Sequence, residues 1–190
     1  FLIIIFFNTN SFSYDSDPKI FIAELVNDAL NTLADKNISI SDKKQKIKII
    51  ALENVDINAL SMYTLGGVRK SLDQDTLEEY KKLFEKYFLK SLTSRLADYS
   101  EKKFEVISAN QKSETTTIVI SRIVKTPSQP EIKIEWRIYT KDPSKPLIRD
   151  LIVEGLSLAK TQKEEFASIL NSKNNDINIL FSKLEEFINN

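Results

Sequence analysis

The densest group of side chains that could take part in a reaction lies in one stretch, from Asp150 to Ser157. Asp150 and Glu154 are four residues apart, a spacing that places both carboxylates on the same face of a β-strand. A carboxylate close to a serine is part of what acyl transfer or general acid–base catalysis requires. The competing role, which we favour for these carboxylates, is ion pairing with Arg149 or Arg95.

The rest of the composition does not supply what such catalysis needs. The 190 residues contain no His to activate a serine and no Cys to act as a nucleophile or metal ligand. The three Gly are too few for a phosphate-binding glycine loop, and Gly155 is better explained by a bend or bulge where a strand leaves its sheet. We therefore predict a binding protein that is not an enzyme and that holds no metal and no cofactor.

Charge and hydropathy narrow the class further. Lys and Arg together number 27 and so do Asp and Glu, which gives a net charge of zero and no excess for binding nucleic acid. Hydrophobic residues make up 42% and charged residues 28%, a composition typical of a globular domain. The length fits one domain with a substantial core.

The first residues have a different character. Residues 1–7 are an uncharged apolar run, far shorter than the ~20 residues of a membrane-spanning helix. Small residues follow at Ser11 and Ser13, which is typical of the end of a secretory signal peptide. We expect residues 1–13 to be the remnant of such a peptide and residues 14–190 to be a single binding domain. A buried first strand is the alternative.

Helical periodicity dominates both ends of this domain. Asp17 and Pro18 fit the N-cap and first position of a helix over residues 18–33, and Ser41 is the predicted cap of a helix over 39–52. A short helix over 56–62 should end before Gly66, and the longest helix should run over 75–98 with a capping box that begins at Asp75. Two more helical patterns cover 166–170 and 177–187.

Strand patterns occupy the middle, over residues 104–107, 116–124, 131–139 and 147–154. The third alternates, with Ile132, Ile134, Trp136 and Ile138 on one face and charged residues on the other. The order of helices, strands and helices predicts an α+β domain with helices packed on one face of an antiparallel sheet of about four strands.

Three stretches also carry a family pattern. The opening pattern is Phe21-x-x-x-Leu25-Val26-x-x-Ala29-Leu30. The middle pattern is Leu65-Gly66 followed by Tyr80-x-x-Leu83-Phe84 and Ser94-Arg95-Leu96-x-x-Tyr99. The third is Asp150-Leu151-Ile152-Val153-Glu154-Gly155-Leu156-Ser157-Leu158 with Phe166-Ala167-Ser168-Ile169-Leu170. In this order and spacing the chain resembles the MlaC family, the periplasmic phospholipid carriers also called toluene-tolerance proteins.

The resemblance implies an NTF2-like fold in which a curved sheet and helices enclose a lipid cavity. It also implies a periplasmic location and a role in maintaining outer-membrane lipid asymmetry. The partners implied are phospholipid, an outer-membrane lipoprotein–porin complex and an inner-membrane ABC transporter with an MCE-domain protein.

A lipid carrier needs a dry apolar pocket, because one acyl chain loses on the order of 10 kcal/mol on leaving the bilayer for water. The apolar faces available for such a pocket lie on the longest helix, on the third strand and beyond the fourth strand: Phe84, Phe88, Leu92, Ile134, Trp136, Ile138, Leu156 and Leu158. For any one of them, packing in an ordinary core is the competing interpretation.

Two functions from other classes stay open. An NTF2-like isomerase would use a carboxylate base with a raised pKa, faced by a donor such as Tyr in an apolar pocket. A pure interaction module would have a filled core without a cavity.

Overall fold

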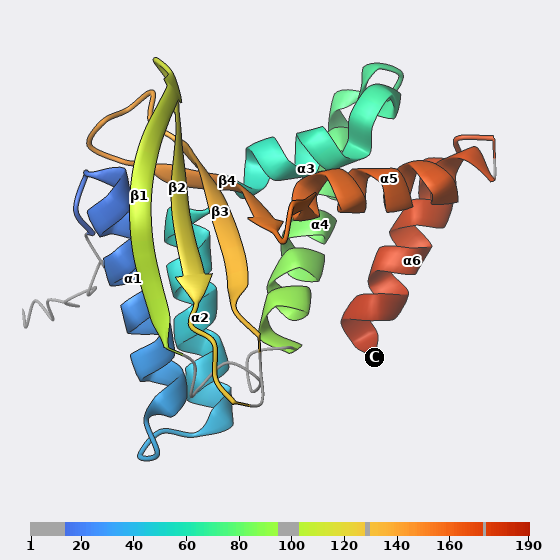
Figure 1. Ribbon diagram of the computed structural model, residues 1–190. Coiled ribbons are helices and arrows are strands. Elements are labelled where there is room, and N and C mark those ends of the chain that lie inside the picture. Colours follow the sequence, from blue (N-terminus) through green and yellow to red (C-terminus); the bar gives the residue numbers. More distant parts are fainter. Residues whose placement is uncertain (1–13, 95–102, 128–129, 173) are drawn as a thin grey trace, which may run out of the picture.

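The computed structural model describes residues 14–94, 103–127, 130–172 and 174–190 (Figure 1). In chain order its elements are α1 (Pro18–Ala34), α2 (Ile40–Asn54), α3 (Ile57–Leu65), the 3₁₀ helix η1 (Gly66–Lys70), α4 (Gln74–Ser94), β1 (Phe104–Ser113), β2 (Thr116–Ile123), β3 (Ile132–Tyr139), β4 (Leu147–Val153), β5 (Leu156–Ser157), α5 (Leu158–Asn171) and α6 (Ile177–Asn189). The predicted α+β order is confirmed. The predicted signal peptide and the predicted end of the longest helix lie outside the described residues.

The helices begin where side chains can satisfy their first free N–H groups. As predicted, Asp17 caps α1, with Pro18 at the first helical position. Two other predicted caps are wrong. Ser39 caps α2, so Ser41 lies inside the first turn, and Asp73 accepts from the third N–H of α4, so Asp75 lies inside that helix. Both segments offer two suitable residues in close succession, and the sequence pattern does not distinguish them.

The five strands form one antiparallel sheet in the order β1-β2-β3-β4-β5. The fifth strand was not predicted, because Glu154 was assigned to the fourth strand and Gly155 to a bulge. Glu154 and Gly155 instead form a two-residue hairpin turn, with φ of 50° and 82°. Positive φ at both turn residues is what a type I′ hairpin requires, and a glycine adopts it without strain.

Strand β1 is also longer than predicted, since it runs to Ser113 and not to Ile107. Its second half is polar and mostly exposed, so it lacks the apolar alternation on which the prediction relied. The register shifts between Val106 and Ser108, a bulge that leaves Ile107 half exposed at the edge of the sheet.

Alternation gives the sheet an inner and an outer face. Trp136 pairs with Val119 of β2 and with Leu151 of β4, and partners in an antiparallel pair point to the same side. This inner face is apolar, whereas Lys133 and Arg137 lie exposed on the outer face. The alternation predicted for the third strand is therefore confirmed.

Two clusters of buried residues form the interior. The sheet core consists of Phe21, Ile22, Leu25, Leu33, Ile47, Ile50, Val119, Trp136, Ile138 and Ile148. The helical core consists of Ile57, Leu65, Tyr80, Phe84, Phe166, Leu170, Leu180, Phe181 and Leu184. Helices α1 and α2 thus cover the inner face of the sheet, and α3 to α6 form a second body beside it (Figure 1). Among the described residues, no helix is long and apolar enough to cross a membrane.

The two cores should lose stability together, because α4 contributes to both. Ile138 of the sheet core and Leu180 of the helical core are completely buried. Replacing either with Ala should lower the free energy of unfolding by about 2–5 kcal/mol in urea titrations. The control Ile40→Ala, at a residue 73% exposed, should change it by less than about 0.5 kcal/mol. Two separate transitions, each moved by one variant, would contradict the shared role of α4.

Candidate functional site

The sheet core and the helical core meet along the second half of α4. Phe84 belongs to the helical core, and its ring stacks on that of Phe88 with centroids 6.4 Å apart. Leu92, one turn beyond Phe88, packs against the sheet core instead. Phe88 and Leu92 are both half-buried. Spacing of four residues keeps these three side chains on one stripe of the helix, so the stripe passes from one core to the other.

Trp136 belongs to the sheet core and is held in place by two contacts within the sheet. Its Nε1 donates to the Ser121 hydroxyl at 2.8 Å, and the ring of Phe104 meets it edge-on at 6.1 Å. The buried indole N–H therefore has its partner, which burial of Trp requires. With Ile138 completely buried beside it, Trp136 forms a rigid part of the inner face.

The inner face continues from this buried part to the molecular surface. Ile134 pairs with Val153, and Val153 pairs with Leu156, so the three side chains form one line across β3, β4 and β5. We call this line the apolar row. Ile134 and Val153 are half-buried, and Leu156 is 69% exposed. Leu158, the first residue of α5, is 49% exposed close by in the chain.

The structure thus separates the eight residues predicted to bind lipid into three groups. Leu92, Ile134, Trp136 and Ile138 lie in or against the sheet core. Phe84 and Phe88 lie in or against the helical core. Leu156 and Leu158 lie at the surface, at the β4–β5 hairpin. Sequence reasoning missed Leu151 and Val153, although their spacing of two on a predicted strand was a usable signal.

Two open hollows are lined by no residue of the apolar row. One, of about 360 Å³, is lined by Ala23, Glu24, Asn27, Leu30, Phe104 and Val106, and so opens between α1 and the edge strand β1. The other, of about 450 Å³, lies over Gly66 and Gly67, between the end of α3 and α5. Neither is lined by a residue predicted to bind lipid.

The two candidate carboxylates do not act as a pair. Asp150 is 4% exposed and lies 3.6 Å from Arg137, while Arg149 binds Asp56 at 2.8 Å. The expected pairing of Asp150 with Arg149 is therefore wrong, and Arg95 lies outside the described residues. Glu154 sits in the hairpin turn, where its carboxylate accepts from the backbone N–H of Lys133. Both carboxylates hold structure together, since Asp150 accepts a hydrogen bond from the Ser157 hydroxyl and Glu154 accepts one from Lys133.

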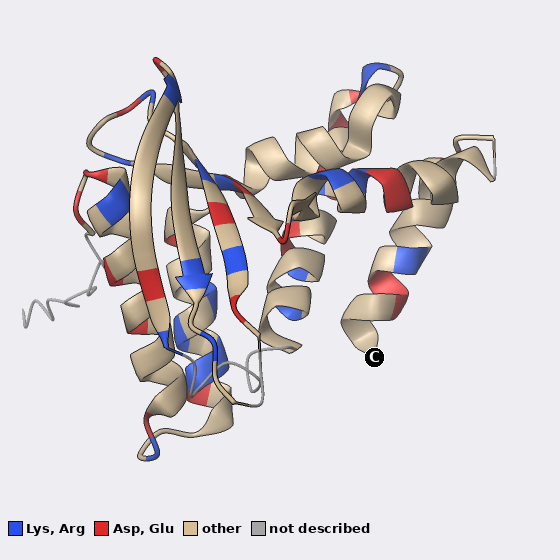
Figure 2. Ribbon diagram, viewed as in Figure 1, with Lys and Arg blue, Asp and Glu red and all other residues tan. Residues whose placement is uncertain are grey.

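The outer face of the sheet carries interspersed charges of both signs (Figure 2). Glu105 of β1 binds Arg122 of β2 at 2.9 Å, and Arg122 also binds Glu131 at 3.0 Å. Such exposed pairs contribute little to stability but keep this face solvated. In the described part of the chain, no three acidic side chains are grouped so that they could hold a metal ion.

Comparison with known proteins identifies the family. A family model described as MlaC protein matches residues 23–186. The chain belongs to the MlaC family. No curated protein matches the sequence significantly.

A solved structure shares the fold of this MlaC-family chain. It is a phospholipid-binding protein from Ralstonia solanacearum, determined in complex with a phospholipid. The TM-score is 0.75 at 17% sequence identity, and the match covers 92% of this chain and 97% of the other. The predicted fold class is confirmed, with five strands in place of about four.

The folded domain should be insensitive to pH between about 5 and 8, because the chain has no His or Cys to titrate there. Hydrogen bonds from Lys103 and Arg122 lower the pKa of Glu105, so its contribution to stability is lost as the pH falls below about 4. Burial raises the pKa of Tyr80, so the stability from that group is lost as the pH rises above about 10. Melting temperatures measured from below pH 4 to above pH 10 check both limits. A steep loss near neutrality would contradict the expectation.

Proposed function

We propose that this chain is a phospholipid carrier that holds acyl chains against the apolar row and the stripe of α4 from Phe88 to Leu92. The observation that carries the proposal is the continuity of the row, from the half-buried Ile134 to the 69% exposed Leu156. Leaving such a surface in water costs free energy, and an acyl chain lying along it would remove that cost. Membership in the MlaC family and the phospholipid bound by the Ralstonia protein support the same ligand.

The proposed contacts suit a carrier because they are apolar and non-directional. An acyl chain needs on the order of 10 kcal/mol to leave the bilayer for water, and burial against Phe88, Leu92 and the apolar row offsets that cost. Because no contact to the acyl chain is directional, the lipid can bind in more than one position and can be released. We propose that the chain works in the periplasm and shuttles phospholipid between an outer-membrane lipoprotein–porin complex and an inner-membrane ABC transporter with an MCE-domain protein. It would thereby support lipid asymmetry.

The isomerase alternative receives no support from Asp150 or Glu154. It requires a carboxyl group that faces a pocket without charged partners, so that burial raises its pKa. Asp150 is buried, but it accepts two hydrogen bonds and faces Arg137. Glu154 is exposed in a turn.

The acyl site can be tested with Phe88→Glu and Leu156→Glu. A carboxylate among acyl chains keeps water in the site or takes up a proton at a cost of several kcal/mol, so phospholipid per purified protein should fall by roughly tenfold or more. The effect should be larger for Phe88→Glu, because Glu at the exposed position 156 can turn towards water. Lipid extraction with mass spectrometry measures the ratio, and circular dichroism confirms folding.

Ile40→Glu is the matched control, since Ile40 is as exposed as Leu156 but lies at the start of α2. It should keep the wild-type ratio. If both test variants fold and also keep that ratio, the acyl site is elsewhere. Unfolding of Phe88→Glu would assign Phe88 to a close-packed core, and a wild-type chain without phospholipid would favour an interaction module.

A further inference from the structure

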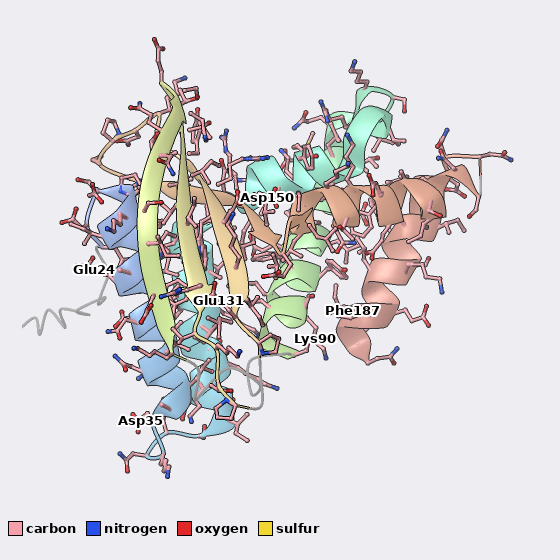
Figure 3. The ribbon with its side chains drawn as sticks, viewed as in Figure 1. Glu24, Asp35, Lys90, Glu131, Asp150 and Phe187 are labelled. Carbon is pink, nitrogen blue, oxygen red and sulfur yellow. The ribbon has the colours of Figure 1, made fainter. Side chains whose placement is uncertain are left out.

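Asp150 is the one carboxylate that is fully buried among the described residues, at 4% exposure. Its Oδ2 accepts from the Ser157 hydroxyl at 2.6 Å, and its Oδ1 accepts from the N–H of Ala159 at 3.0 Å. The guanidinium of Arg137 lies 3.6 Å away. We call these four residues the Asp150 clamp. Figure 3 shows Asp150 where β4 and α5 come together. A buried charge needs hydrogen-bond and ion-pair partners such as these, because burial without them costs free energy.

The clamp joins four elements, β3 through Arg137 and β4, β5 and α5 through its other residues. Asp150 belongs to β4, Ser157 ends β5 and caps α5, and Ala159 lies in the first turn of α5. Strand β5 has two residues, and the turn before it has positive φ at both positions. A hairpin this short is not stable through its own hydrogen bonds. The carboxylate also lies at the N-terminus of α5, where the helix dipole favours negative charge.

Ser157 stands between the two exposed leucines at the end of the apolar row. Because neighbouring residues of a strand point to opposite faces, Ser157 turns to the outer face and Leu156 to the inner face. Leu158 follows directly as the first residue of α5. Whatever fixes Ser157 therefore fixes the place of both leucines.

We propose that Asp150 is a positioning residue for lipid exchange. Through Ser157 it holds Leu156, the exposed end of the apolar row, and the adjacent Leu158 in place, and it thereby sets the rate at which a phospholipid leaves. This role rests on the proposed carrier function. When the clamp is weakened, Leu156 and Leu158 lose their fixed places at the end of the row, water reaches the acyl chain and release becomes faster.

Asp150→Asn tests the role in the full chain. The variant keeps the shape of the side chain but loses the charge that binds Ser157 and Arg137. A fluorescent phospholipid is loaded, and its transfer to excess vesicles of phosphatidylethanolamine and phosphatidylglycerol is followed together with the melting temperature. Release should be roughly tenfold faster than for the wild type, the equivalent of one charge-assisted hydrogen bond.

Asp56→Asn is the matched control. It removes the ion pair of Asp56 with Arg149, which ties the start of α3 to β4 without contacting the hairpin leucines. Both variants should melt at a lower temperature, but Asp56→Asn should release lipid at the wild-type rate. If release instead follows the melting temperature in both variants, Asp150 has a structural role alone and the proposal is overturned.

A second pair of variants decides the matter if Asp150→Asn does not fold. Ser157→Ala removes the hydroxyl that donates to Asp150, whereas Ser157→Thr keeps a hydroxyl and a good helix cap. The Ala variant should release lipid faster and the Thr variant should restore the wild-type rate. Asp176→Ala, which removes the cap of α6, controls for loss of a cap and should leave release unchanged.

The outcomes separate the two proposals. A wild-type chain that takes up no phospholipid contradicts the carrier function and the role of Asp150 with it. A wild-type chain that loads phospholipid, with Asp150→Asn and Ser157→Ala releasing it at the wild-type rate, contradicts the role of Asp150 alone.

Discussion

The structure depends on one helix that buries apolar side chains in two bodies at once. Helix α4 places Tyr80 and Phe84 among α3, α5 and α6, and it places Leu92 against the sheet core. With 21 residues it is about 30 Å long, enough to span both bodies. Each body alone is smaller than the whole domain, and the fraction of surface buried on folding falls as a chain becomes shorter. The shared helix therefore holds the fold together and carries the stripe from Phe88 to Leu92 that forms part of the proposed site.

A junction between two cores is a suitable place for an apolar ligand. Inside each core the side chains interdigitate. In the helical core the buried Tyr80 hydroxyl also has a hydrogen-bond partner, the Thr64 hydroxyl at 2.9 Å. Close-packed interiors of this kind leave no room for a guest. Along the stripe from Phe88 to Leu92 and along the apolar row, by contrast, the side chains are half-buried or, at Leu156, exposed. Elsewhere the sheet is closed by α1 and α2 on its inner face and by charged pairs on its outer face.

The distinctive stretch from Asp150 to Leu158 has a structural explanation that its composition does not suggest. Its acid and its serine are seven residues apart and bind each other across a hairpin. Its glycine provides positive φ, and its glutamate ties the turn to β3 by accepting from the N–H of Lys133. Residue types that resemble a reaction centre in the sequence thus form a junction between strand and helix, which places two leucines at the surface.

Local patterns predicted most of the elements because each depends on few neighbours. Asp17 and Pro18 located the start of α1, and alternation over residues 131–139 located β3 and its buried face. The patterns failed where the local signal was ambiguous. Ser39 and Ser41 could each cap α2, the polar half of β1 has no apolar period, and a two-residue strand such as β5 is too short to show one.

The sequence by itself determined the α+β class, the exclusion of His and Cys chemistry, and which side of β3 is apolar. Tertiary structure decided which side chains pair with one another and which elements pack together. A register shift between Arg137 and Ile138 pairs Arg137 with Asp150 and takes Arg149 out of the ladder, so that Arg149 turns to Asp56. Likewise Phe84 and Trp136, both predicted for one pocket, belong to different cores. Periodicity records which face of an element is buried, but it carries no information on which distant element covers that face, because that depends on register and on the packing of the whole chain.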